Sequence, residues 1–433
     1  MFVPVDTLYD YLEHVVNHDL VIYRFWPHGS KNIKNLVPVR NYTMTESITR
    51  PILICHDQEP LAFEQYQSHN IQDAMWFQDW PVEFRQFWLA RNLRSACEIN
   101  LYDRALLTHS EHNSDQVSRY QAAGFEPVYV WTNALLARDW FRYAMVDPRL
   151  NDSCTLEYDF NVYARAWSGT REYRLFFLAQ LSDIAHHCRV SFGVKDTGHY
   201  LDHEFGNPRF DIRGMDIENL FGDTEITSDS SASYDAEHYR RCMIDIVLET
   251  VFDDQRVHLT EKTLRPIACG QPFMLAAGPM SLQYLHGYGF ETFANVIDES
   301  YDQETNPIRR LQMIVQEMRR ISRLSTQQKR TLKKTLHAIA QRNRQHFFSL
   351  DFFNQIINEY QVNMQQAMIA VSASRQATEL NQHIALYDKW PEFRLHPDAA
   401  LFLEAVSKQG YDQLWVANQA LDHSAPDLPD AVS

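Results

Sequence analysis

The residues best suited to chemistry in this chain are Thr260, Glu261 and Lys262, which open a predicted helix over residues 260–268. A polar loop precedes this helix, and a strand is predicted before the loop at residues 244–248. The start of a helix favours an anion, because its free backbone N–H groups and its dipole both present positive charge there. Threonine is a preferred capping residue, and the lysine adds a full charge. The pattern predicts a site for a phosphate-bearing ligand.

Two further residues belong to the same edge of the predicted sheet. Glu249 follows the first strand and offers a carboxylate to ribose hydroxyls. Gly278 follows the next predicted strand, at residues 272–276, and lets the backbone come close to a ligand. Open parallel sheets bind ligands outside the carboxyl ends of their strands. Taken singly, each residue of this pattern would be interpreted as ordinary helix capping or as a surface lysine, and only their combination favours a ligand site.

The residues around this helix resemble a known family, and one pattern carries the resemblance: Thr260-Glu261-Lys262, Pro266, Gly270, Pro272-Phe273 and Gly278. The pattern is similar to the donor-binding half of fucosyltransferase-like glycosyltransferases of the GT-B fold, and to glycosyltransferase sequences of bacteriophage genomes. The resemblance extends over residues 160–301 and is looser in the N-terminal half. Where the family has Phe-Glu-Asn, this chain has Leu248-Glu249-Thr250.

The resemblance implies specific roles for the site residues. Lys262 would contact the phosphates of a nucleoside-diphosphate sugar, Glu249 would hold the ribose, and Arg174 would neutralise the leaving diphosphate. Arg165, Arg171 and Arg174 fall in one strand, turn and helix segment, where guanidinium groups can hold phosphate oxygens through paired hydrogen bonds. We expect Arg174 to support catalysis, with Arg165 as the second choice.

Three carboxylates are candidates for the base that takes the acceptor proton. Asp57 and Glu59 follow the predicted strand at residues 51–54, and Asp139 lies in a polar cluster after a second predicted strand at residues 128–131. The alternative for the first pair is a solvated turn between strand and helix. The alternative for Asp139, which the residue types favour, is helix capping and a salt bridge.

The formal net charge of −16 argues against a protein whose whole surface wraps nucleic acid. Residues 308–346 are nevertheless strongly basic, and their only acid is Glu317. Such a face can bind a polyanionic acceptor, although a solvated helical surface is the simpler interpretation, and we favour it. The residues predicted to bind a polyanion are Arg319, Arg320, Arg323, Lys333 and Lys334.

These patterns together predict a glycosyltransferase with a nucleotide sugar as co-substrate. The histidines lack metal-ligand spacing, so neither a metal nor another cofactor is expected. No Gly-rich phosphate loop of an NTPase or a dehydrogenase is present. Resemblance to phage sequences suggests a hydroxymethylated base of duplex DNA as acceptor, flipped out of the helix. The alternatives are a surface glycan or lipopolysaccharide acceptor, and a non-catalytic protein that binds a sugar nucleotide or a polyanion.

The elements that must position these residues alternate between strands and helices along 433 residues, which predicts an α/β protein with two domains. The family resemblance implies that both domains are Rossmann-like and face each other across a cleft, as in the GT-B fold. The predicted ranges are 1–150 for an acceptor domain, 151–350 for a donor domain, 351–422 for helices packing back on the first domain, and 423–433 for a disordered tail. No apolar run is long enough to span a membrane and no signal peptide is recognised, so a cytoplasmic location is expected, in the host if the chain is phage-encoded.

Overall fold

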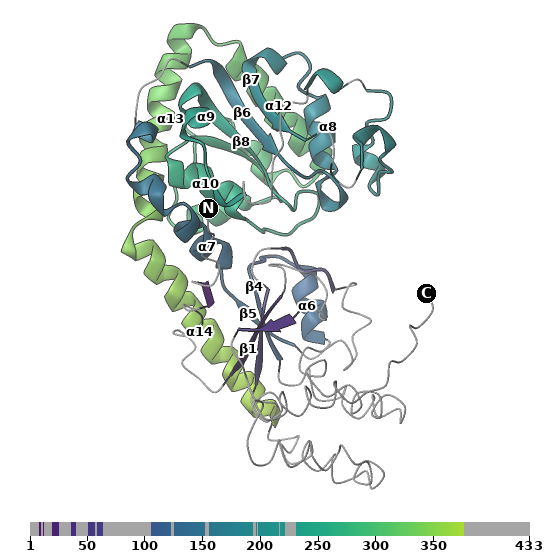
Figure 1. The fold of residues 1–433 in the computed structure, drawn as a ribbon, viewed down its shortest axis with the longest axis vertical. Coiled ribbons are helices and arrows are strands. Elements are labelled where there is room, and N and C mark those ends of the chain that lie inside the picture. The colour runs from purple at the N-terminus through teal and green to yellow at the C-terminus, as the bar shows by residue number, and fades with distance from the viewer. Residues whose placement is uncertain are drawn as a thin grey trace, which may run out of the picture. The chain divides into compact units, whose positions relative to one another are not determined.

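The computed structural model describes residues 8–9, 12, 20–25, 36–39, 51–56, 59–63, 105–122, 125–151, 156–193, 196, 198–215, 217–220 and 231–375. These residues form a mixed α/β structure with two sheets of mainly parallel strands, which confirms the predicted fold class at this level (Figure 1). The chain divides into two compact units. The C-terminal unit comprises Met1–Tyr11, Ser110–Ser114 and Trp131–Asn358, and the N-terminal unit comprises Leu12–His109, Asp115–Val130 and Glu359–Ser433.

The N-terminal unit contains a five-stranded sheet in the order β2-β1-β3-β4-β5. Its strands are β1 (Val21–Phe25), β2 (Leu36–Pro38), β3 (Ile52–Cys55), β4 (Ala105–His109) and β5 (Glu126–Tyr129). β2 is antiparallel to β1, and the other neighbouring pairs are parallel. Helix α6 (Asp115–Ala122) connects β4 to β5, which confirms the strand-helix-strand unit that the sequence predicts over residues 105–131. From Glu359 the last helix also groups with this unit, and its Asn363 donates a hydrogen bond to the Tyr129 carbonyl at 2.9 Å.

The C-terminal unit contains a four-stranded, fully parallel sheet in the order β7-β6-β8-β9. Its strands are β6 (Tyr158–Ala164), β7 (Cys188–Phe192), β8 (Cys242–Leu248) and β9 (Phe273–Ala276). The helices are α7 (Thr132–Trp140), α8 (Tyr173–Ala179), α9 (Ala236–Arg241), α10 (Glu261–Cys269), α11 (Ser281–Gly287), α12 (Pro307–Ser322), α13 (Thr326–Phe347) and the first part of α14 (Leu350–Arg375). The sequence predicts a second strand-helix-strand unit, with strands at residues 160–164 and 189–194 and a helix between them, and β6, α8 and β7 form it. It also predicts a helix at residues 281–287, which are the bounds of α11.

Helices cover both faces of this sheet. Every residue of β8 is buried, as expected for a parallel strand that is enclosed on both sides. α9 and α10 lie on the face that carries Tyr163, because His238 of α9 bonds its hydroxyl and Arg265 of α10 lies 4.8 Å from its ring centroid. α8 lies on the opposite face, since the crossover from β6 to β7 runs in the opposite direction to that from β7 to β8.

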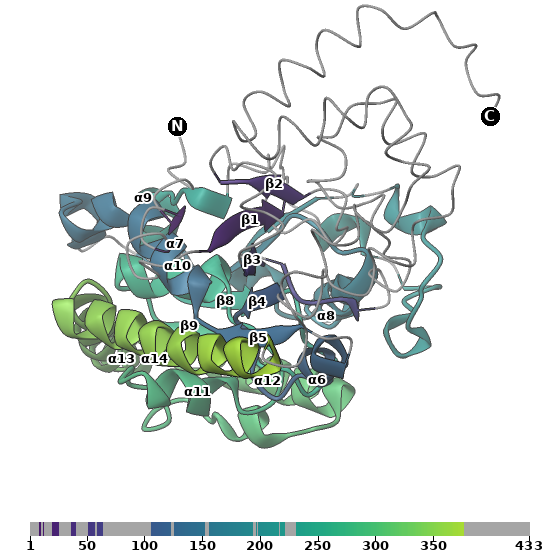
Figure 2. The same ribbon diagram turned by 90° about the horizontal axis from the view of Figure 1, so that it is seen from below.

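Tertiary contacts shortened some predicted helices. The sequence periodicity predicts a helix over residues 171–186, but α8 ends at Ala179. The next carbonyl, that of Gln180, accepts a hydrogen bond from Arg319 of α12 at 2.9 Å. The sequence also predicts a long helical stretch from residue 306 to about residue 368, and this stretch is divided into the helices α12, α13 and α14 (Figures 1 and 2). Ser325 begins α13 with a capping box. At the second break, Arg138 holds the carbonyls of residues 347–349.

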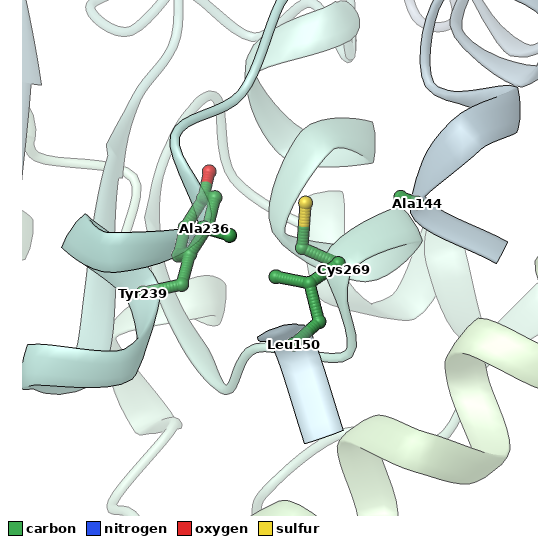
Figure 3. Packing of buried hydrophobic residues seen from close by; sticks show 5 residues of the cluster. All are labelled: Ala144, Leu150, Ala236, Tyr239 and Cys269. Atoms are coloured by element: carbon green, nitrogen blue, oxygen red, sulfur yellow. The ribbon is translucent and has the colours of Figure 1, made fainter. Parts of the chain in front are cut away.

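A small apolar cluster explains why residues 131–150 belong to the C-terminal unit, although the predicted boundary at residue 150 assigns them to the first domain. Ala144 and Leu150 pack with two residues of α9 and with Cys269 at the end of α10 (Figure 3). Arg344 of α13 also donates to the Ala144 carbonyl. Residues 131–150 thus share a core with the helices that surround the predicted donor site.

Among the described helices, none has the length and apolar character that crossing a membrane requires.

Candidate functional site

The predicted donor residues gather where the order of the C-terminal sheet reverses. β7, the next strand in the chain after β6, lies on one side of β6 in the sheet, and β8 lies on the other side. Ligands of open parallel sheets bind at such a switch point. Val162 of β6 is paired with Ile246 of β8, so the carboxyl ends of the two strands lie side by side. Arg165 follows β6 and Glu249 follows β8 at this place.

Glu249 connects the end of β8 to the start of α10. Its carboxylate accepts hydrogen bonds from the backbone N–H of Thr260 at 2.9 Å, from the Thr260 hydroxyl at 2.7 Å and from the Thr263 hydroxyl at 2.6 Å. The side chain is fully buried. Sequence patterns predict a contact between Glu249 and ribose, but here the carboxylate lies inside the protein and supplies the anion that the start of α10 favours.

Thr260 caps α10 as predicted, since its hydroxyl accepts the backbone N–H of Lys262. The Lys262 ammonium lies 2.8 Å from a Glu261 oxygen and 3.2 Å from the Thr260 hydroxyl, and its side chain is 29% exposed. Burial acts to raise the pKa of Glu261, but the Lys262 ammonium and its hydrogen bond outweigh that effect, so the pKa is lowered. Lys262 is therefore a partly exposed cation at the ligand edge, held in place by its neighbours.

Arg174 lies at the switch point but is only 2% exposed. Its guanidinium donates to the carbonyls of Ala166 at 2.5 Å, Leu248 at 2.6 Å and Glu249 at 2.9 Å. Burial lowers the pKa of Arg174. The predicted contact with a diphosphate is not what this geometry provides, because backbone carbonyls occupy the guanidinium. Arg174 instead joins the loop after β6 to the end of β8.

Arg165, the second choice of the sequence analysis, is the more accessible arginine. It is exposed immediately after β6, and within the part of the chain that the structure describes its guanidinium forms no ion pair or hydrogen bond. Arg165 and Lys262 thus provide two accessible positive charges along the same edge.

The loops above this edge are hydrogen-bonded to one another, an arrangement that sequence patterns did not reveal. Glu172, just before α8, accepts hydrogen bonds from His203 at 2.9 Å and from the N–H groups of Gly206 at 2.7 Å and Asn207 at 2.8 Å. The Asn207 amide in turn donates to Asp253 at 2.8 Å. The loops that follow β6, β7 and β8 are therefore linked. The only sequence feature that points to this arrangement is an acid, Glu172, just before a helix, and that feature does not identify its hydrogen-bond partners.

Gly278 follows β9 and is closely packed against the loop after β8. A Cβ atom added at this glycine would lie 2.0 Å from the backbone carbonyl oxygen of Arg256. The close approach that sequence patterns assigned to a ligand is made here by the protein's own backbone. Its effect is to hold the loop that leads into α10.

The substitution Gly278→Ala is therefore expected to destabilise the C-terminal unit by about 1–3 kcal/mol, since a backbone atom cannot move aside as a flexible side chain can. Urea denaturation of the two proteins measures the difference. Gly287→Ala is the matched control, because its added Cβ meets no atom within 4 Å. Equal denaturation midpoints for Gly278→Ala and the unchanged chain would contradict the close packing.

The three predicted base candidates lie in different environments. Asp57 lies outside the described residues. Glu59 is half-buried after β3 in the N-terminal unit. Asp139 lies on α7 in the C-terminal unit, where its carboxylate is 3.4 Å from the guanidinium of Arg142. The salt bridge offered as the alternative for Asp139 is present.

Acidic side chains neutralise part of the positive charge of the basic stretch, residues 308–346, in the folded chain. Arg319 pairs with Asp183 at 2.9 Å, and Arg320 pairs with Glu317 at 2.5 Å. Arg323 and Lys334 are exposed, and Lys333 is half-buried. Partial neutralisation by acids is what the solvated-surface interpretation predicts.

Comparison with known proteins gives no family for the chain: no protein-family model, no curated protein and no solved structure matches it. Within the described ranges, no group of three or more His, Cys, Asp or Glu side chains is arranged to hold a metal ion. The functional hypothesis therefore depends on the chemistry at the edge of the C-terminal sheet.

Proposed function

We propose that this chain is a glycosyltransferase of the GT-B type, with a nucleoside-diphosphate sugar bound by the C-terminal unit and an acceptor hydroxyl bound by the N-terminal unit. The observation that carries the proposal is the presence of two accessible cations, Lys262 and Arg165, at the switch point of an open parallel sheet. Diphosphates are recognised by such cations, and this edge is where parallel sheets bind nucleotides.

The proposed reaction is a substitution at the anomeric carbon of the sugar. The acceptor oxygen forms a bond to that carbon, the bond from carbon to the diphosphate oxygen breaks, and the hydroxyl proton passes to a base. Negative charge accumulates on the leaving diphosphate. Lys262 and Arg165 stabilise this charge, and such preorganised electrostatic contacts are commonly the largest catalytic contribution.

Glu249 and Arg174 serve the proposed site without contacting the donor. Glu249 fixes the first turn of α10, and thereby Lys262, to β8. Arg174 fixes the end of β8 to the loop that follows Arg165. Buried side chains that lock charged groups in place reduce the reorganisation that the reaction would otherwise require.

The acceptor is an alcohol, and a hydroxymethylated base of phage duplex DNA is the first candidate. A surface glycan is the second, and one observation favours it: the ion pairs of Arg319 and Arg320 reduce the positive charge that duplex DNA would need on that face. An assay that offers both kinds of acceptor to the protein distinguishes the two candidates.

The test is to incubate the protein with uridine, guanosine and thymidine diphosphate sugars, each with hydroxymethylated duplex DNA, unmodified duplex DNA or lipopolysaccharide. Release of the nucleoside diphosphate and incorporation of the sugar are measured together. Turnover with hydroxymethylated but not unmodified DNA supports the first acceptor, and turnover with lipopolysaccharide supports the second. Donor binding without turnover would identify a non-catalytic binding protein, and no donor binding would refute the proposal.

A further inference from the structure

Three large apolar side chains are exposed together in residues 142–146, a segment that we call the apolar turn. Tyr143 is 57%, Met145 is 56% and Val146 is 69% exposed. Single apolar residues on a surface are common, whereas several that adjoin one another mark a surface that contacts something apolar. Among the described residues, no other three exposed large apolar side chains lie within four positions of the chain.

The backbone of the apolar turn is fixed to the C-terminal unit. Ala144 lies between the exposed residues, is fully buried and belongs to the same apolar cluster as Cys269 (Figure 3). The Ala144 carbonyl accepts a hydrogen bond from Arg344 of α13, and the Val146 N–H donates to the Tyr143 carbonyl at 3.2 Å. The exposed side chains cannot turn inward without removing Ala144 from this cluster, so the folded chain keeps them in contact with water.

Helix α13, which holds the apolar turn through Arg344, contains no acid among its 22 residues. Arg330, Lys334 and His337 are exposed on this helix and follow one another at intervals of four and three positions, so they lie on one face. We call these three residues the basic stripe. The same face continues to Arg344, which lies two helical turns, about 10 Å, beyond His337. The basic stripe therefore leads toward the apolar turn.

The basic stripe keeps its positive charge in the folded chain. Arg330 and Lys334 form no ion pair with any acid of the described residues, in contrast to Arg319 and Arg320 of α12. Burial lowers the pKa of His337, and the nearby positive charges of α13 lower it further. A surface of one charge sign attracts ligands of the opposite sign. This face thus combines a positive charge with an adjoining apolar projection.

We propose that the apolar turn and the basic stripe form a surface that binds an anionic lipid membrane. The apolar side chains would enter the headgroup layer and leave water, while the cations would lie against the lipid phosphates. The Arg142 guanidinium lies 4.7 Å from the ring centre of Tyr143, and tyrosine is a residue that favours the boundary between headgroups and water. Duplex DNA would attract the basic stripe alone, because its backbone offers phosphates without an apolar layer.

The test is sedimentation of the full chain with vesicles of phosphatidylcholine, with and without phosphatidylglycerol, and without any nucleotide sugar. The chain should bind the anionic vesicles, and salt should weaken this binding. Val146→Ser is expected to lower the partition coefficient about 10-fold, because less apolar surface leaves water. Lys334→Ala is expected to lower it about 5-fold, since one cation is lost near the anionic surface. Both side chains are exposed, so the variants should fold, which circular dichroism checks.

The matched controls are Ile369→Ser and Arg213→Ala. Ile369 is 63% exposed on α14 in the N-terminal unit, and the Arg213 side chain is 81% exposed outside the basic stretch. Both controls should partition as the unchanged chain does. Equal partitioning of Val146→Ser and the unchanged chain, or no binding to anionic vesicles, would overturn the proposal. Binding of duplex DNA that requires Lys334 but not Val146, without vesicle binding, would assign the basic stripe to nucleic acid instead.

Discussion

Lys262→Ala is expected to lower kcat/KM for the nucleotide sugar by about 100- to 1,000-fold, the loss seen when one preorganised contact to a developing negative charge is removed. The Lys262 side chain is 29% exposed and lies at the ligand edge of the sheet, so its loss should affect charge stabilisation more than folding. The effect is measured by steady-state kinetics with whichever nucleotide sugar the protein uses in the assay above, and by calorimetric titration of that donor.

The matched control for this change is Arg149→Ala, which removes a cation whose side chain is 60% exposed and which lies outside the basic stretch, in the short turn Pro148–Asn151. It should leave both kinetics and binding unchanged. Equal activity of Lys262→Ala and the unchanged chain would refute the placement of the diphosphate. A double-mutant cycle with Arg165→Ala adds a stricter test: two cations on one diphosphate should show a coupling energy, whereas two unrelated cations should have additive effects.

Glu249→Ala is expected to lower the free energy of unfolding of the C-terminal unit by about 3–5 kcal/mol, because it leaves three buried donors of Thr260 and Thr263 without their acceptor. Urea denaturation followed by circular dichroism measures this loss. Glu237→Ala provides the comparison, since Glu237 is an exposed acid in the first turn of α9. That substitution should cost less than about 1 kcal/mol.

The same experiment separates a structural role of Glu249 from the ribose contact that the family resemblance implies. A structural role predicts reduced stability, with donor affinity retained in the fraction that is still folded. A ribose contact predicts normal stability with reduced donor affinity. Normal stability in Glu249→Ala would show that the hydrogen bonds to α10 contribute little.

Local sequence patterns were sufficient for the elements around the candidate site. The apolar run of β8, the capping threonine of α10 and the glycine after it, which adopts a φ of +67°, identify a strand, a helix and its end. The strand and helix were predicted to within a few residues. These features depend on neighbours within a few positions of the chain, since hydrogen bonding in a helix turn and alternation in a strand are short-range properties.

The partners of charged side chains, by contrast, could not be predicted from local sequence patterns. The resemblance assigned Arg174 to a diphosphate, but the folded chain surrounds its guanidinium with carbonyls, including that of Leu248, 74 residues away. Arg319 is one of several basic residues in the sequence, and only the fold brings Asp183 to it from 136 residues away. An arginine has the same donors in either setting, so its residue type does not determine whether it binds a ligand or a backbone carbonyl.

The segment Ser110–Ser114 shows the same limit most clearly. The strand β4 ends directly before it and the helix α6 begins directly after it, and local patterns indicate both elements. The pairing of Glu111 with Arg256 joins residues 145 positions apart. Periodicity and capping thus indicated where α10 begins, while long-range pairing joined Glu111 to the loop before it, because such contacts depend on which distant segments the fold brings together.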